Sequence, residues 1–236
     1  MASKTGLMEA VKAFRWRDVD AALTESPELL DFRGERGRNW LHLCCGSPLK
    51  GAGRTAADSI ATADVLLSKG LGIDEEAFSE GAWKATPLWF AIGWGGNLPL
   101  AEHLLERGCN PNFCLWAASY NRDLEAIRML IAHGAVVDDP AGKDTPFLDA
   151  VKWSRFDAAE ELLRHGADVN ARDGKGMTAL HLMLRKGSEP THLRMIAAHG
   201  ARGDIPDPRG VTANQIMRRK RDPDLKRLAE QLASGS

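Results

Sequence analysis

The sequence predicts an all-α protein built from repeated pairs of short helices. One motif has two apolar residues, two spacers and a glycine, and it ends at Gly70, Gly108, Gly134, Gly166 and Gly200. A second motif resembles Thr-Pro-Leu and starts at Asn39, Thr86, Thr145, Thr178 and Thr212. A period of 33 residues, typical of one class of helical repeat, fits seven times into the 236 residues.

The first motif predicts the end of an amphipathic helix. Glycine adopts the left-handed backbone of a helix C-cap at the lowest conformational cost. The second motif predicts a helix start, because Thr or Asn caps the first turn and Pro is preset for the first helical position. Thr86, Thr145 and Thr178 precede their glycines by 22, 21 and 22 residues, which is room for two short helices and a turn.

Composition excludes several classes of protein. The chain is 44% hydrophobic and 27% charged, as in ordinary globular proteins, and its net charge of -1 gives no overall basic field for nucleic acid or anionic membranes. The longest apolar stretch, 88–94, is too short for a membrane helix, and the N-terminus lacks the apolar region of a secretory signal. Reduced cysteines then suggest the cytoplasm, and abundant Arg and Ala suggest a bacterial source.

At this point the sequence resembles the ankyrin-repeat family over nearly its whole length. Thr178-Ala-Leu-His-Leu is similar to the family's Thr-Pro-Leu-His signature, and 165–173 is similar to its helix end and hairpin. The resemblance implies helix–turn–helix units joined by short β-hairpin fingers and stacked as a solenoid. We therefore expect one domain over 1–236, with an N-terminal cap repeat (1–38), internal repeats (39–210) and a C-terminal cap repeat (211–236).

Seven helix pairs follow in order along the chain. Their first helices are expected to begin near Leu7, Trp40, Pro87, Cys114, Pro146, Ala179 and Ala213. The first pair lacks the Thr-Pro start, and the last has a polar outer helix, as end repeats that face water require.

Three segments depart from the repeat. Residues 46–55 form an extra loop inside the second pair, the finger at 71–85 is enlarged and acidic, and the finger at 109–112 is nearly deleted. The deletion places Phe113 in the Thr position of the fourth pair. Either these changes open a notch that gives partner specificity, or they are neutral drift in loops.

Candidate binding residues lie at the ends of the first helices of each pair, which the resemblance places on the concave surface. They are Trp94, Tyr120, Asn121, Lys152, Trp153, Arg185 and Lys186. Aromatic residues and Arg contribute disproportionately to interface energy, so this composition suits partner binding. The alternative is that the Trp rings complete the core. Trp89 and Trp116 occupy a packing position, whereas Trp83 in the enlarged finger either anchors a partner or folds back.

The sequence gives little support for a phosphate-binding, metal-binding or catalytic site. Residues 46–51 lack the Gly-Lys-Ser/Thr end of a phosphate loop. Cys109 and Cys114 could belong to a metal or small-molecule module, but zinc needs four convergent ligands. No nucleophile motif or carboxylate pair stands out, so we expect no catalysis and no cofactor. Arg218-Arg-Lys-Arg221 is either a nucleic-acid or acidic-surface site or the solvated end of a helix.

The sequence therefore predicts a stand-alone, non-catalytic protein-binding module with another protein as its partner. By analogy with the family it would act as an inhibitor, immunity or accessory factor. We expect a monomer in the absence of the partner, no membrane association, and no nucleic-acid partner.

Overall fold

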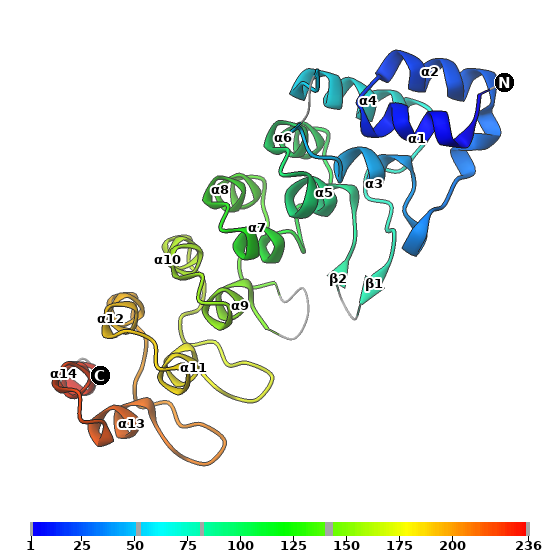
Figure 1. The fold of residues 1–236 in the computed structure, drawn as a ribbon. Coiled ribbons are helices and arrows are strands. Elements are labelled where there is room, and N and C mark those ends of the chain that lie inside the picture. The colour runs from blue at the N-terminus through cyan, green and yellow to red at the C-terminus, as the bar shows by residue number, and fades with distance from the viewer. Residues whose placement is uncertain (1, 51–52, 81–82, 140–143, 235–236) are drawn as a thin grey trace. The chain divides into compact units, whose positions relative to one another are not determined.

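The computed structural model describes residues 2–50, 53–80, 83–139 and 144–234, and helices dominate it (Figure 1). The chain forms two compact units, Met1–Ala118 with Arg128–Ala135, and Ser119–Ile127 with Val136–Ser236. Helices α7 (Leu115–Asn121) and α8 (Leu124–Ala132) each have residues in both units.

The first unit contains three helix pairs. They are α1 (Lys4–Lys12) with α2 (Trp16–Glu25), α3 (Trp40–Cys45) with α4 (Ala56–Ser68), and α5 (Pro87–Phe90) with α6 (Leu98–Glu106). Two 3-10 turns, Pro27–Asp31 and Glu35–Gly37, connect the first pair to the second. The first helices of the pairs pack in one row, α1 on α3 on α5, and the second helices in another, α2 on α4 on α6.

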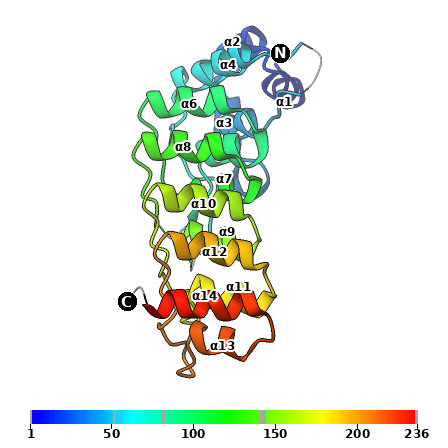
Figure 2. The same ribbon diagram turned by 90° about the vertical axis from the view of Figure 1, so that its left-hand side faces the viewer.

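The second unit continues the same arrangement. Its helix pairs are α9 (Pro146–Lys152) with α10 (Phe156–Arg164), α11 (Ala179–Lys186) with α12 (Pro190–Ala198), and α13 (Ala213–Arg219) with α14 (Pro223–Ser234). Figure 2 shows α10, α12 and α14 side by side. The described residues thus contain seven helix pairs, as predicted.

Helix starts and ends follow the two motifs. The side chains of Asn39, Thr86 and Thr145 accept hydrogen bonds from the backbone three residues on, as N-caps do. The five motif glycines all have positive φ, from 87° to 107° at Gly70, Gly134, Gly166 and Gly200 and 85° at Gly108. The glycine prediction is confirmed, and the cap prediction is confirmed at these three positions and at Thr212. At Thr178 the side chain makes no cap hydrogen bond and instead lies 2.8 Å from His181 Nδ1.

Two predicted helix starts need correction. The first helix begins at Lys4 rather than Leu7, because the Ser3 hydroxyl accepts a hydrogen bond from the Gly6 N–H and caps an earlier turn. The fourth begins at Leu115 rather than Cys114, since Phe113 has a left-handed backbone (φ 69°) and no side-chain oxygen that could cap.

A π-helical turn over Ala91–Gly95 ends the first helix of the third pair, and the sequence did not predict it. A π turn inserts one extra residue into the helix. It forms where the chain passes the α3 terminus very closely: a Cβ at Gly95 would lie 2.2 Å from the Cys45 carbonyl oxygen. The turn fixes the direction in which Trp94 leaves the helix.

Short antiparallel fingers connect the pairs. In the enlarged finger, β1 (Ser79–Glu80) pairs with β2 (Trp83–Lys84), with Ser79 opposite Lys84. Two later fingers are closed by single bridges, Arg172 to Thr178 and Pro206 to Thr212. The predicted extra loop lies between α3 and α4, and its residues 51–52 lie outside the described residues.

Candidate functional site

Trp94 leaves the π turn with much of its indole ring in solvent. Its side chain is 54% exposed, although it contacts Phe90 edge-on at 4.9 Å and Trp89 at 5.9 Å between ring centroids. The Arg38 guanidinium lies 5.4 Å from the Trp94 ring centroid. Trp94 is therefore held by aromatic neighbours in the first unit while one part of it remains available for contact.

Tyr120 and Trp153 form the aromatic centre of the second unit. Tyr120, near the end of α7, is 48% exposed and contacts Trp153 edge-on at 5.2 Å. The Arg155 guanidinium lies 5.6 Å from the Tyr120 ring centroid, within cation–π range. Asn121 is exposed at the end of the same helix, before Arg122 turns the chain with φ 58°. Three of the predicted residues thus lie close together around one exposed phenol.

Lys152 is engaged within the chain. Its ammonium group lies 2.7 Å from Asp144 and 3.3 Å from Asp173. Burial acts to lower the pKa of Lys152, but hydrogen bonds and charge from the two carboxylates outweigh it, so the pKa is raised. Lys152 therefore links Asp144, just before the start of α9, to Asp173 in the next finger, and these carboxylates already neutralise its charge.

Lys186 and Arg185 end helix α11 with exposed side chains. The Lys186 ammonium donates to the Lys152 carbonyl and, at 3.0 Å, to the Ser154 hydroxyl. Lys186 thus caps the preceding first helix, where a cation also suits the helix dipole.

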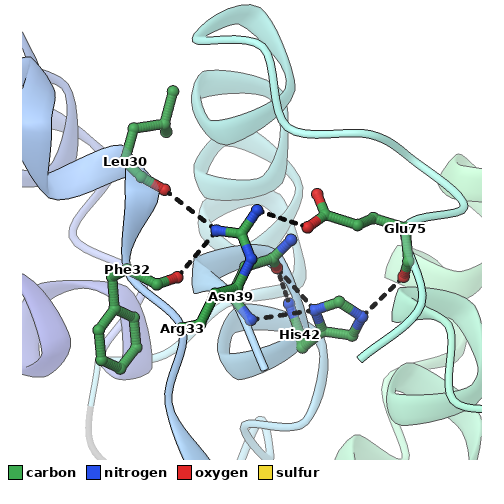
Figure 3. Close-up of polar contacts among 6 residues, drawn as sticks. All are labelled: Leu30, Phe32, Arg33, Asn39, His42 and Glu75. Atoms are coloured by element: carbon green, nitrogen blue, oxygen red, sulfur yellow. Dashed lines mark hydrogen bonds and ion pairs between the residues drawn. The ribbon is translucent and has the colours of Figure 1, made fainter. Parts of the chain in front are cut away.

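The enlarged finger is bound to the rest of the first unit near its base (Figure 3). The Arg33 guanidinium donates to Glu75 at 2.6 Å and to the Phe32 carbonyl at 3.0 Å. The His42 Nε2–H donates to the Glu75 carbonyl at 2.8 Å, while Nδ1 accepts from the Asn39 N–H at 3.2 Å. Burial lowers the pKa of His42 to about 4, so its imidazole is neutral at pH 7.

The tryptophans of this region pack inward. Trp83 is half-buried, 5.3 Å from Phe78 and 4.9 Å from Trp89 between ring centroids, so it folds back onto its own finger and α5. Trp89 is buried, in agreement with the predicted packing role. The shortened connection at 109–112 meets the enlarged finger, because the Asn110 N–H donates to Asp74 at 2.9 Å.

The cysteines are all buried and unpaired. Burial raises the pKa of Cys109 to about 12, and raises that of Cys114 further, so both remain thiols. In the described part of the chain, no group of three or more His, Cys, Asp or Glu side chains is placed to hold a metal ion. Over the same residues, no helix is both long and apolar enough to cross a membrane.

The repeat pattern did not mark the basic residues around Trp94. Lys12, Arg38 and Arg54 line an open cavity with Trp94 and Phe90. A signal for Lys12 was present, because it ends α1, the first helix of its pair, as Lys152 ends α9. Arg38 and Arg54 follow no repeat position, so only the folded chain brings them together.

Comparison with known proteins identifies the repeat. Residues 88–173 match the family model described as ankyrin repeats (3 copies). Inversin of Homo sapiens is 38% identical over 91 residues, covering 37% of this chain and 8% of inversin. The chicken (Gallus gallus) Arf-GAP with coiled-coil, ANK repeat and PH domain-containing protein 2 is 37% identical over 79 residues, covering 32% and 10%. The chain thus spans about a tenth or less of these relatives.

Solved structures match over much more of the chain. The human ASB11 ankyrin repeat domain has a TM-score of 0.71 at 20% identity and covers 96% of both chains. The Bcl-3 ankyrin repeat domain has a TM-score of 0.70 at 19% identity, covering 95% of this chain and 97% of the other. An ankyrin repeat domain from Acinetobacter baumannii has a TM-score of 0.64 at 21% identity, covering 82% and 97%. These matches confirm the predicted all-α solenoid fold.

Proposed function

We propose that the chain is an ankyrin-repeat protein that binds another protein and catalyses no reaction. The support is a match of residues 88–173 to the family model and a fold similar to solved ankyrin repeat domains over most of the chain. Ankyrin repeats are protein–protein interaction modules, which is the general basis of the proposal. The observation that carries it is the exposure of two fixed aromatic rings, Trp94 and Tyr120, at 54% and 48%. Such residues are typical of interface hot spots.

The proposed contact residues have different roles. Trp94, Tyr120 and Trp153 supply apolar contact area, and Asn121 and Arg185 add exposed polar groups. Lys152 and Lys186 act mainly as positioning residues, because their ammonium groups already bind Asp144, Asp173 and the Lys152 carbonyl. We further propose that the protein is a bacterial, cytoplasmic monomer that serves as an inhibitor, immunity or accessory factor.

The test starts from the partner itself. Wild-type protein captures it from a lysate of the source organism, and its affinity is then measured with purified components. Trp94→Ala and Tyr120→Ala should each weaken binding about tenfold or more, because truncating a hot spot removes a large part of the contact energy. Val136→Ala is the control, since Val136 is 57% exposed and is not among the proposed contact residues. Unchanged affinity in both folded aromatic variants would contradict the proposal.

The basic segment at the end of α13 supports a second candidate, a nucleic-acid or acidic-surface site. All four side chains of 218–221 are exposed. Binding through them would weaken steeply with salt and would be lost when Arg218 and Arg219 are replaced by Gln. Salt-independent partner binding would leave only the first proposal.

A further inference from the structure

The first unit contains an open cavity of about 350 Å³ where α1, α3 and the π turn end. Figure 1 shows α1, α3 and α5, the helix that leads into the π turn, next to one another. One part of the cavity wall is formed by basic residues and another part by apolar or aromatic residues. The lining residues are Lys12, Arg38, His42, Leu43, Gly46, Ser47, Pro48, Arg54, Phe90 and Trp94.

Two departures from the repeat build this cavity. The inserted loop contributes Ser47, whose hydroxyl donates to the Leu43 carbonyl at 2.6 Å, and Arg54, which donates to the Pro48 carbonyl at 3.0 Å. The π turn contributes Trp94. Hydrogen bonds within the described residues thus hold the wall in place before any partner arrives, which reduces the entropy lost on binding.

The cavity is positive. None of its ten lining residues is acidic, and His42 is neutral at pH 7. Arg38 is paired with Glu35 at 3.0 Å. Within the described part of the chain, neither Lys12 nor Arg54 lies within salt-bridge distance of a carboxylate. Two cations that face one half-enclosed space without a counter-ion favour an anionic group there.

The aromatic part of the wall indicates what carries the anion. Trp94 is 54% exposed and adjoins Phe90, Leu43 and Pro48, so an apolar side chain next to the anionic group would gain contact area. A small inorganic anion would use only the cations. An extended acidic peptide would use both parts of the wall, with its carboxylate at Lys12 and Arg54 and its neighbouring apolar residue on Trp94.

We propose that this cavity binds an Asp or Glu side chain, followed or preceded by an apolar residue, in an acidic segment of the protein partner. The proposal rests on the proposed function and specifies its partner chemistry. It assigns Lys12, Arg38 and Arg54 to the partner surface, beyond the inner-helix positions that the repeat pattern marks.

A random peptide library displayed on phage tests the proposal. Selection on the wild-type protein should enrich Asp or Glu next to an apolar residue, and selection on Lys12→Gln/Arg54→Gln should not. The selected peptide should bind the double variant at least about tenfold more weakly, since each lost ion pair changes affinity severalfold. Lys226→Gln/Arg227→Gln, which removes two exposed cations of α14, is the matched control and should bind normally. The Trp94 indole N–H resonance should shift on binding.

Several outcomes would overturn the assignment. One is a selection that yields no peptide, or peptides without excess Asp or Glu. Another is equal enrichment on the Lys12→Gln/Arg54→Gln variant. The last is full displacement of the peptide by inorganic phosphate, which would make the cavity a general anion site. If the natural partner loses affinity on Trp94→Ala but not on Lys12→Gln/Arg54→Gln, the proposed function stands and the acidic-segment assignment fails. If Trp94→Ala and Tyr120→Ala also leave the affinity for the natural partner unchanged, both the proposed function and the acidic-segment assignment fail.

Discussion

Protonation of His42 should destabilise the protein as the pH falls below 6. The imidazole is buried between Asn39 and the enlarged finger, where Nδ1 accepts one hydrogen bond and Nε2–H donates another. The folded-state pKa is about 4 and the unfolded value is 6.5, so the unfolded chain binds more protons between these values. Stability from neutral His42 is thus fully present above pH 6.5 and is lost as the pH falls toward 4.

The magnitude follows from the pKa difference. At pH 5 almost every unfolded chain carries a protonated His42, but only about a tenth of folded molecules do. Integrating the proton linkage from pH 7.5 to pH 5 gives about 2 kcal/mol, and the full difference is about 3 kcal/mol.

His42→Gln isolates this contribution. The Gln amide can still donate toward the Glu75 carbonyl but cannot titrate, and it loses the edge contact of the imidazole with Phe90 at 5.4 Å. Urea unfolding of both proteins at several pH values gives their difference in unfolding free energy. That difference should shrink by about 2 kcal/mol between pH 7.5 and pH 5. A pH-independent difference, or an NMR titration of His42 near pH 6.5, would refute the reasoning.

Three other perturbations test neighbouring arguments. Gly95→Ala should lower the free energy of unfolding by about 2 kcal/mol in urea titrations, because its Cβ would lie 2.2 Å from the Cys45 carbonyl oxygen. Gly93→Ala is its control and should be neutral or stabilising, since its Cβ would meet only ordinary contacts at 3.5 Å. Burial and nearby Asp144 raise the pKa of Asp149 to about 6, so its contribution to stability falls as the pH rises from 4 to 6. Asp149→Asn should therefore stabilise by about 1 kcal/mol at pH 7.5 after screening, with no gain near pH 4 in the same titrations.

The repeat pattern predicted what each repeat specifies locally. Caps such as Thr145 and glycines such as Gly166 act within a few residues, so the motifs gave six of the seven first-helix starts to within a residue. The repeat pattern did not predict the π turn because its cause is distant in the sequence. Gly95 is needed at a close approach to Cys45, 50 positions earlier. The pattern did not predict the ion pair between Lys152 and Asp173 for the same reason, since this pair joins separate repeats.

The candidate site was predictable only in part. Periodicity gives the position of Tyr120 near the end of its helix, but the direction of Trp94 depends on the π turn, which periodicity does not predict. The basic cavity depends on Lys12, Arg38 and Arg54, which the sequence spreads over 43 positions and three structural segments. Only the inserted loop and the packing of α1 on α3 bring these charges to one wall. A pattern that repeats cannot indicate a site that interrupts the repeat.

The enlarged finger has a role that its acidic sequence did not suggest. Gly37 has φ 76°, and a Cβ there would lie 2.3 Å from the Ala77 carbonyl oxygen, so the 3-10 turn before α3 closes directly onto the finger. Arg33 and His42 fix Glu75 on the same side. Arg38, which lines the basic cavity, stands between Gly37 and the start of α3. Because Arg33 and His42 bind Glu75, this residue helps to hold the finger against the turn that precedes Arg38. Asp74 instead accepts a hydrogen bond from the Asn110 N–H, and Glu76 pairs with Lys84 within the finger.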